Sequence, residues 1–102
     1  MKVRLLPEAI QDLEIGSDFY ESQGPGVGAY FLDSLIADID SLELYAGIHA
    51  MDRGFHRSAS KRFPFVIYYL INGEYVDVYA VLDARQEPES IDVKMSAPRT
   101  KP

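Results

Sequence analysis

Two runs rich in β-branched and aromatic residues, 65–71 and 75–82, flank the dipeptide Asn72-Gly73. Asn-Gly supplies the positive backbone φ angles that a tight turn requires, so the sequence predicts a β-hairpin at this point. A two-residue loop fixes which residues of the two strands lie opposite each other. The expected pairs are Ile71 with Glu74, Tyr69 with Val76, Ile67 with Val78, and Phe65 with Ala80.

Side chains alternate between the two faces of a strand, which gives the predicted hairpin an apolar face and a mixed face. The apolar face holds those eight paired residues and is apolar apart from Glu74 at the tip. We expect it to pack against helices. The opposite face carries tyrosines and an aspartate, and we expect it to be partly exposed to water. Its residues are Val66, Tyr68, Leu70, Tyr75, Asp77, Tyr79 and Val81.

The chain has 102 residues, a length typical of one domain. It contains no cysteine, which excludes disulfide bonds and thiolate chemistry. The sequence has no apolar run long enough for a membrane span and no signal peptide pattern at its start. We therefore expect a cytoplasmic protein without a membrane partner.

Charge is distributed unevenly along the sequence. The net charge of −6 argues against a protein that binds nucleic acid through general electrostatic attraction. Residues 8–43 hold nine acidic residues and no Lys or Arg, whereas residues 53–62 hold four cations and no anion. The pattern predicts acidic helices beside a locally basic strand.

The remaining elements follow from periodicity. Residues 1–6 are typical of a short strand. Apolar residues at helical spacing predict helices over 8–23 and 27–45, separated by Gly24-Pro25-Gly26. Residues 45–54 show no period and are expected to form a loop, and 55–61 a strand. We expect one helical turn at 88–91 and a disordered tail over 95–102.

The predicted order is β-α-α-β-β-β. This order favours an α+β, two-layer domain over residues 1–94, in which a helical hairpin packs on a small, mainly antiparallel sheet. The sequence does not indicate which later strand pairs with the first.

Four segments carry a resemblance to a known family. They are Leu6-Pro7-Glu8-Ala9 with Asp12-Leu13, the helix from Phe31 to Leu42, the strand Phe63-Pro64-Phe65-Val66-Ile67-Tyr68-Tyr69, and the closing strand Ala80 to Pro88. In this order they resemble the RelE/ParE toxins of bacterial type II toxin–antitoxin systems, of the plasmid-stabilisation type. The resemblance covers about residues 3–91.

The resemblance implies a small toxin that a cognate antitoxin neutralises by wrapping around it. ParE-like members inhibit DNA gyrase by binding, and we take this as the first hypothesis. The expected partner-binding residues lie on the mixed sheet face and at its margins: Tyr68, Tyr79, Tyr75, Arg57 and Arg85.

A RelE-like alternative is a metal-free endoribonuclease that cuts mRNA on the ribosome. That chemistry requires groups that deprotonate the 2′-hydroxyl, stabilise the phosphorane and protonate the leaving oxygen. By resemblance the catalytic residues are Arg57 and Arg85. Three further family positions fall on inert residues: Ala59, Val66 and Ile91. A non-toxic orphan member of the family is a second alternative.

A metal site is a weaker prediction than the two site hypotheses above. His49, Asp52 and His56 lie near one another in sequence, but their spacing does not match a regular metal site. We expect no metal and no small-molecule cofactor.

Overall fold

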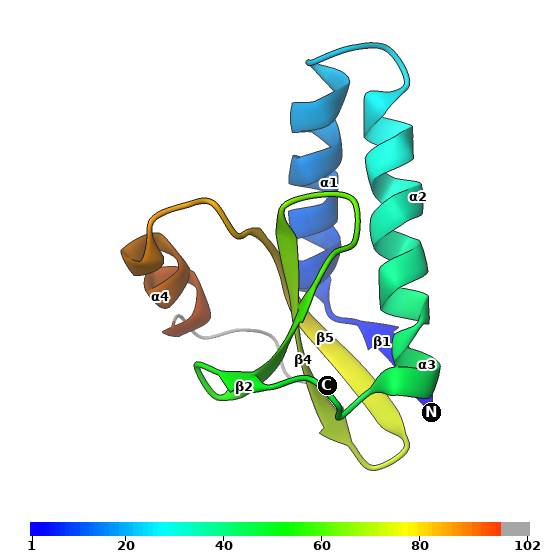
Figure 1. Ribbon diagram of the computed structural model, residues 1–102, viewed down its shortest axis with the longest axis vertical. Helices are drawn as coiled ribbons and strands as arrows, with labels where there is room; N and C mark the ends of the chain where they lie inside the picture. Colours follow the sequence, from blue (N-terminus) through cyan, green and yellow to red (C-terminus); the bar gives the residue numbers. More distant parts are fainter. Residues whose placement is uncertain (97–102) are drawn as a thin grey trace.

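A computed structural model describes residues 1–96 of the chain. Its elements run in the order β1 (Lys2–Leu5), α1 (Pro7–Glu21), α2 (Val27–Asp40), α3 (Leu42–Tyr45), β2 (Met51–Asp52), β3 (Phe55–Ala59), β4 (Phe65–Asn72), β5 (Tyr75–Asp83) and α4 (Pro88–Ser96). The helical hairpin lies on one face of the sheet and α4 lies on the other (Figure 1). The predicted α+β class, with helices packed on a mainly antiparallel sheet, is confirmed.

The five strands are ordered β1-β5-β4-β3-β2. β1 is the parallel member, and it pairs with β5, which resolves the choice that the sequence left open. β2 is a two-residue strand at the opposite edge, inside the segment that we expected to be a loop. It forms because Arg53 and Gly54, both at positive φ (55° and 83°), make a tight turn between β2 and β3.

The hairpin of β4 and β5 forms, but its pairing differs from the prediction. Asn72 pairs with Tyr75, so the turn residues are Gly73 and Glu74. Val76 was predicted to lie opposite Tyr69, but it lies opposite Ile71. This shift preserves the predicted faces as far as Val78. A register shift at Tyr68/Tyr69 then leaves Tyr79 as an extra residue in β5.

The extra residue exchanges the two faces of β5 beyond it. Val81 belongs to the core beneath the helical hairpin, and Ala80 packs on the opposite face. Both positions were predicted on the other side. The alternation rule gave the wrong result here because it assumes a regular strand.

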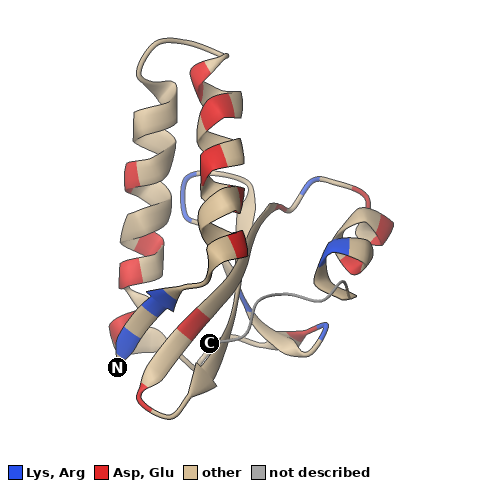
Figure 2. Ribbon diagram, turned by 180° about the vertical axis from the view of Figure 1, so that it is seen from behind, with Lys and Arg blue, Asp and Glu red and all other residues tan. Residues whose placement is uncertain are grey.

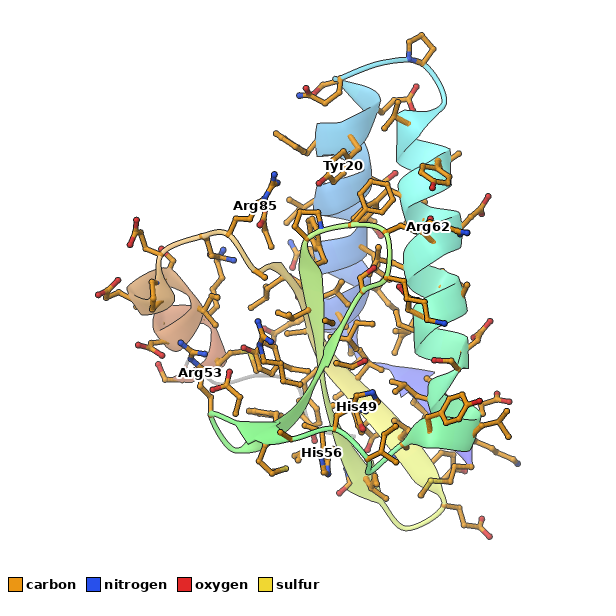
Figure 3. The ribbon with its side chains drawn as sticks, in the orientation of Figure 1. Tyr20, His49, Arg53, His56, Arg62 and Arg85 are labelled. Atoms are coloured by element: carbon orange, nitrogen blue, oxygen red, sulfur yellow. The ribbon has the colours of Figure 1, made fainter. Side chains whose placement is uncertain are left out.

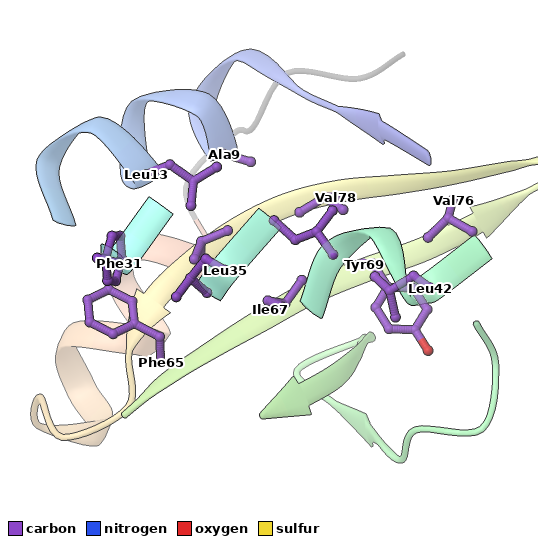
Figure 4. Packing of buried hydrophobic residues seen from close by; sticks show 12 residues of the cluster. Ala9, Leu13, Phe31, Leu35, Leu42, Phe65, Ile67, Tyr69, Val76 and Val78 are labelled. Atoms are coloured by element: carbon purple, nitrogen blue, oxygen red, sulfur yellow. The ribbon is translucent and has the colours of Figure 1, made fainter. Parts of the chain in front are cut away.

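The main core fills the space between α1, α2 and the sheet (Figure 4). Phe31 is fully buried at its centre, and its ring contacts those of Tyr20, Phe63 and Phe65 at centroid distances of 4.9 to 5.1 Å. Acidic side chains mark both long helices, as the charge pattern predicted (Figure 2).

Two elements depart from their expected length. Helix α2 ends at Asp40, and α3 begins again at Leu42. Helix α4 extends to Ser96 instead of stopping at Ile91, and Met95 is buried at its end. The expected disordered tail therefore does not begin at Met95. The prediction of disorder over 97–102 lies outside the residues that the structure describes.

Gly28 allows α1 and α2 to pack closely. A Cβ at this position would lie 2.7 Å from the backbone oxygen of Ser17 on α1. We predict that Gly28→Ala lowers the free energy of unfolding by about 1–3 kcal/mol, because a backbone atom cannot move aside cheaply. Chemical denaturation measures the change. Gly24→Ala is the matched control, since its Cβ would meet Val27 at 3.4 Å, an ordinary contact; an equal loss in both variants would contradict the prediction.

Candidate functional site

The sheet face opposite the helical hairpin holds the predicted site tyrosines, but they are not exposed. Tyr68 and Tyr79 have exposed fractions of 0% and 8%. Ile91 and Met95 of α4 pack onto this face, against residues that include Tyr68. The prediction of a partly wet tyrosine surface was wrong at these two residues. Tyr68 is covered because the segment after β5 forms a nine-residue helix with an apolar side, whereas the Tyr79 ring packs against Phe55 at a centroid distance of 5.2 Å.

Arg53 connects α4 to the sheet. Its Nε donates to the Asp92 carboxylate on α4 at 2.5 Å, and its Nη1 donates to Asp52 on β2 at 2.7 Å. These bonds, first of all the one to Asp92, raise the pKa of the Arg53 guanidinium. Arg53 was not among the predicted site residues. The only signal for it in the sequence is the Arg53-Gly54 pair, a possible tight turn between two short strands.

Tyr68 belongs to the same network. Its hydroxyl donates to the Asp52 carboxylate at 2.8 Å. This hydrogen bond is the main cause that lowers the pKa of Asp52, with Arg53 adding to it. Burial, followed by the bond to Asp52, raises the pKa of Tyr68. Tyr68 therefore serves an internal hydrogen bond in this conformation.

Arg57 and Arg85 belong to different segments and pair with different carboxylates. Nε of Arg57, on β3, is 4.0 Å from the Asp52 carboxylate, and the side chain is 41% exposed. Arg85, beyond β5, makes two bonds to the Asp83 carboxylate at 2.9 and 3.1 Å. This pairing raises the pKa of Arg85 and lowers that of Asp83.

The two arginines thus serve two separate carboxylates. Arg85 also interacts with Tyr20 on α1, and Figure 3 shows these two residues near the helical hairpin, apart from Arg53 beside α4. Arg57 shares Asp52 with Arg53. That Arg57 and Arg85 form a site, catalytic or partner-binding, stays a prediction.

Tyr75 is half-buried near the tip of the hairpin. The Arg4 guanidinium lies over its ring, 3.8 Å from the centroid. Arg4 also makes two bonds to Asp77, at 2.6 and 2.9 Å, and Asn72 donates to the same carboxylate at 2.5 Å. These donors, Arg4 first, lower the pKa of Asp77, which is fully buried instead of wet. Arg4 is a second residue that the sequence analysis missed.

The two histidines lie on the helix side of the sheet. Tyr69, fully buried, has its hydroxyl 2.6 Å from Nδ1 of His49, and the His56 ring stacks on the Tyr69 ring. Burial lowers the pKa of His49, and the neighbouring His56 adds to the effect. Among residues 1–96, no group of three or more acidic, histidine or cysteine side chains is arranged to hold a metal ion. None of the described helices is both long and apolar enough to cross a membrane.

Comparisons with known proteins bear on the fold alone. No family model and no curated protein matches the sequence. The fold, in contrast, matches a solved structure. A chain of the "Chromosomal ParDE TA system from P. aeruginosa" superimposes with a TM-score of 0.76 at 18% sequence identity. The match covers 83% of this chain and 97% of that one. The fold is ParE-like.

The hydrogen bond between Tyr68 and Asp52 gives a pH-dependent test of the α4 network. Because the pKa of Asp52 is lowered in the folded protein, its stabilising effect is complete above the unfolded pKa of about 3.9 and disappears as the pH falls through the folded pKa. We predict that Tyr68→Phe costs about 1 kcal/mol at neutral pH, discounted for the partial exposure of Asp52.

The difference between Tyr68→Phe and the original protein should shrink at acidic pH. Denaturant unfolding across the pH range from neutral to about 3 measures it. Tyr30→Phe, at an exposed tyrosine, is the control and should be neutral throughout. A cost for Tyr68→Phe that is equal at all pH values would show that Asp52 is not the relevant partner.

Proposed function

We propose that this chain is the toxin component of a type II toxin–antitoxin system and acts by binding a macromolecule. The observation that carries the proposal is the fold match, which spans nearly the whole length of a chain from a ParDE system. DNA gyrase is the candidate target, and a cognate antitoxin the proposed partner. At 18% identity the match does not transfer a function by itself, so the proposal also rests on the residues of this chain.

The placement of the arginines favours binding over RNA cleavage. Phosphoryl chemistry needs its charged groups to converge on one phosphate. Arg57 and Arg85 are directed to different carboxylates, whereas each is exposed enough to meet a charged group of a partner by itself. A surface that binds a protein can use such dispersed charges.

Expression in a bacterial host tests the proposal. Induction of the chain alone should arrest growth, and co-expression of a short neighbouring gene that encodes a DNA-binding antitoxin should restore it. Purified protein should inhibit the supercoiling activity of DNA gyrase. Site-specific cuts within translated messages, seen by primer extension, would instead support the ribosome-dependent endoribonuclease. Growth that continues without any partner would indicate a non-toxic orphan.

The double variant Arg57→Ala/Arg85→Ala tests the two predicted site residues. We expect it to fold and to lose at least about tenfold in inhibitory potency, because interfacial arginines are frequently the anchors of binding energy. Gyrase inhibition and growth measure the loss. Lys2→Ala, at an exposed lysine on β1, is the control and should remain toxic. Unchanged toxicity of the double variant would remove both arginines from the site.

A further inference from the structure

The outer edge of β3 is covered along only part of its length. The Arg57 N–H donates outward to the Ala50 carbonyl at 3.0 Å, and the Ser60 N–H donates inward to Phe65 at 2.8 Å. Backbone groups of successive residues alternate in direction along an antiparallel strand, so the N–H and C=O of Ala59 face outward, beyond the end of β2. The next outward N–H, of Lys61, is held by the Asp38 carboxylate at 3.2 Å. Ala59 is therefore a gap in the covered edge.

A hollow of about 340 Å³ opens at this gap. It is bounded by α2, α3, the segment that follows α3, and β3, and its lining includes Asp38, Tyr45, Ile48 and Ala59. Two of its lining residues are large, exposed apolar side chains: Ile48 is 74% exposed and Tyr45 54%. An open strand edge next to exposed apolar groups is typical of a site where a segment of another chain binds.

Three cations, Arg57, Lys61 and Arg62, lie along this edge, near the Asp38 carboxylate that lines the hollow. The nearest carboxylate to the Arg57 guanidinium is 4.0 Å away. Within residues 1–96, neither Lys61 nor Arg62 makes an ion pair with a carboxylate. In a chain of net charge −6, this is a local surplus of positive charge. It favours an acidic partner.

We infer that this surface receives an extended, acidic segment of the antitoxin. The β3-edge surface, as we define it, consists of Tyr45, Ile48, Arg57, Ala59 and Lys61. The inference rests on the proposed function for the identity of the partner. The segment pairs its backbone with Ala59, places apolar side chains against Tyr45 and Ile48, and directs acidic side chains to the cations.

Two other occupants fit the surface less well. A nucleic acid has no peptide groups to continue the hydrogen bonding of a strand edge at Ala59. A second copy that paired its own β3 antiparallel about Ala59 would place Arg57 opposite Lys61 of that copy. Like charges directly opposite are destabilising, so the surface favours a peptide of another chain.

A synthetic peptide tests the inference without knowledge of the antitoxin. The probe has about ten residues, alternates Glu with Val or Ile, and carries a fluorescent label and blocked ends, in keeping with the two faces of a strand. Binding to the full chain is measured by fluorescence anisotropy. We expect saturable binding that weakens as salt is added.

Two control peptides separate backbone pairing from charge. The first is N-methylated at alternate residues and has lost the N–H groups that pair with an edge strand; the second has Lys in place of Glu. Both should bind at least about tenfold more weakly, the loss expected for one or two hydrogen bonds or for repulsion at the cations. Equal binding of the N-methylated peptide would overturn the inference.

Ala59→Pro removes the outward N–H without touching the inward bonds of β3, and proline is tolerated in edge strands. We predict about tenfold weaker binding of the acidic peptide, whereas Ala59→Val, which keeps the N–H, should bind normally. Lys61→Glu should weaken binding of the acidic peptide about fivefold, and Lys2→Glu, at a distant lysine, should leave it unchanged.

Unfolding measurements on each variant check that it is folded. Unchanged binding in both Ala59→Pro and Lys61→Glu would refute the surface.

Further outcomes would also overturn the inference. A single-stranded RNA that binds more tightly than the peptide, with no effect of Ala59→Pro, would make the edge a nucleic-acid site. A dimer in sedimentation that Lys61→Glu dissolves would make it a contact between copies. If the chain is not toxic but binds the peptide, the proposed function is wrong and the inference about the β3-edge surface stands. The inference alone fails if the chain is toxic and neutralised but the peptide does not bind.

Discussion

The extra residue at Tyr79 decides how the two faces of the central hairpin are used. Before it, β5 directs Val76 and Val78 to the helical hairpin; after it, Val81 takes that side. Ala80 and Leu82 are thereby free to meet α4 on the other face. Without the bulge, Val81 would lie under α4 and the core beneath α1 would lose a large apolar side chain. The bulge makes both coverings compatible with one strand.

Polar side chains that are buried in the sheet need hydrogen-bond partners within the protein. Asp77 is fully buried, so it needs the guanidinium of Arg4 and the amide of Asn72 to remain charged. Tyr68 is equally buried, and its hydroxyl is satisfied by Asp52. Asp77 takes its partners from β1 and β4, and Tyr68 takes its partner from β2. These pairs fix the edges of the sheet relative to its centre.

Much of the fold is encoded in patterns that a sequence shows directly. The two long helices, the hairpin and the helix-facing side of β4 follow from periodicity and from the turn near Gly73. The bulge does not, because a single inserted residue leaves the alternation of Tyr75 to Asp83 looking regular. Helix α4 was underestimated because its apolar positions, Ile91 and Met95, make only a short stripe in a polar segment.

The site was harder to predict than the fold for a related reason. Exposure depends on what covers a face, and no local pattern in β4 announces that α4 returns over Tyr68. The resemblance identified Arg57 and Arg85 but not their partners, which lie in a two-residue strand and at the end of β5. Arg4 and Arg53 were missed because their importance comes from contacts with Asp77 and Asp92, distant in sequence.

The way this fold disperses its cations bears on the kind of function it can support. A catalytic centre gains from charges only when they meet at one reacting group, because stabilisation in a water-excluded site falls off with distance. Here Arg4 pairs with Asp77 and Arg85 with Asp83, whereas Arg53 and Arg57 share Asp52. Helix α4 covers part of the sheet face that holds Tyr68. A partner that spans several patches can use each charge where it lies. Charges paired with different carboxylates in this way support the proposed binding of a macromolecule.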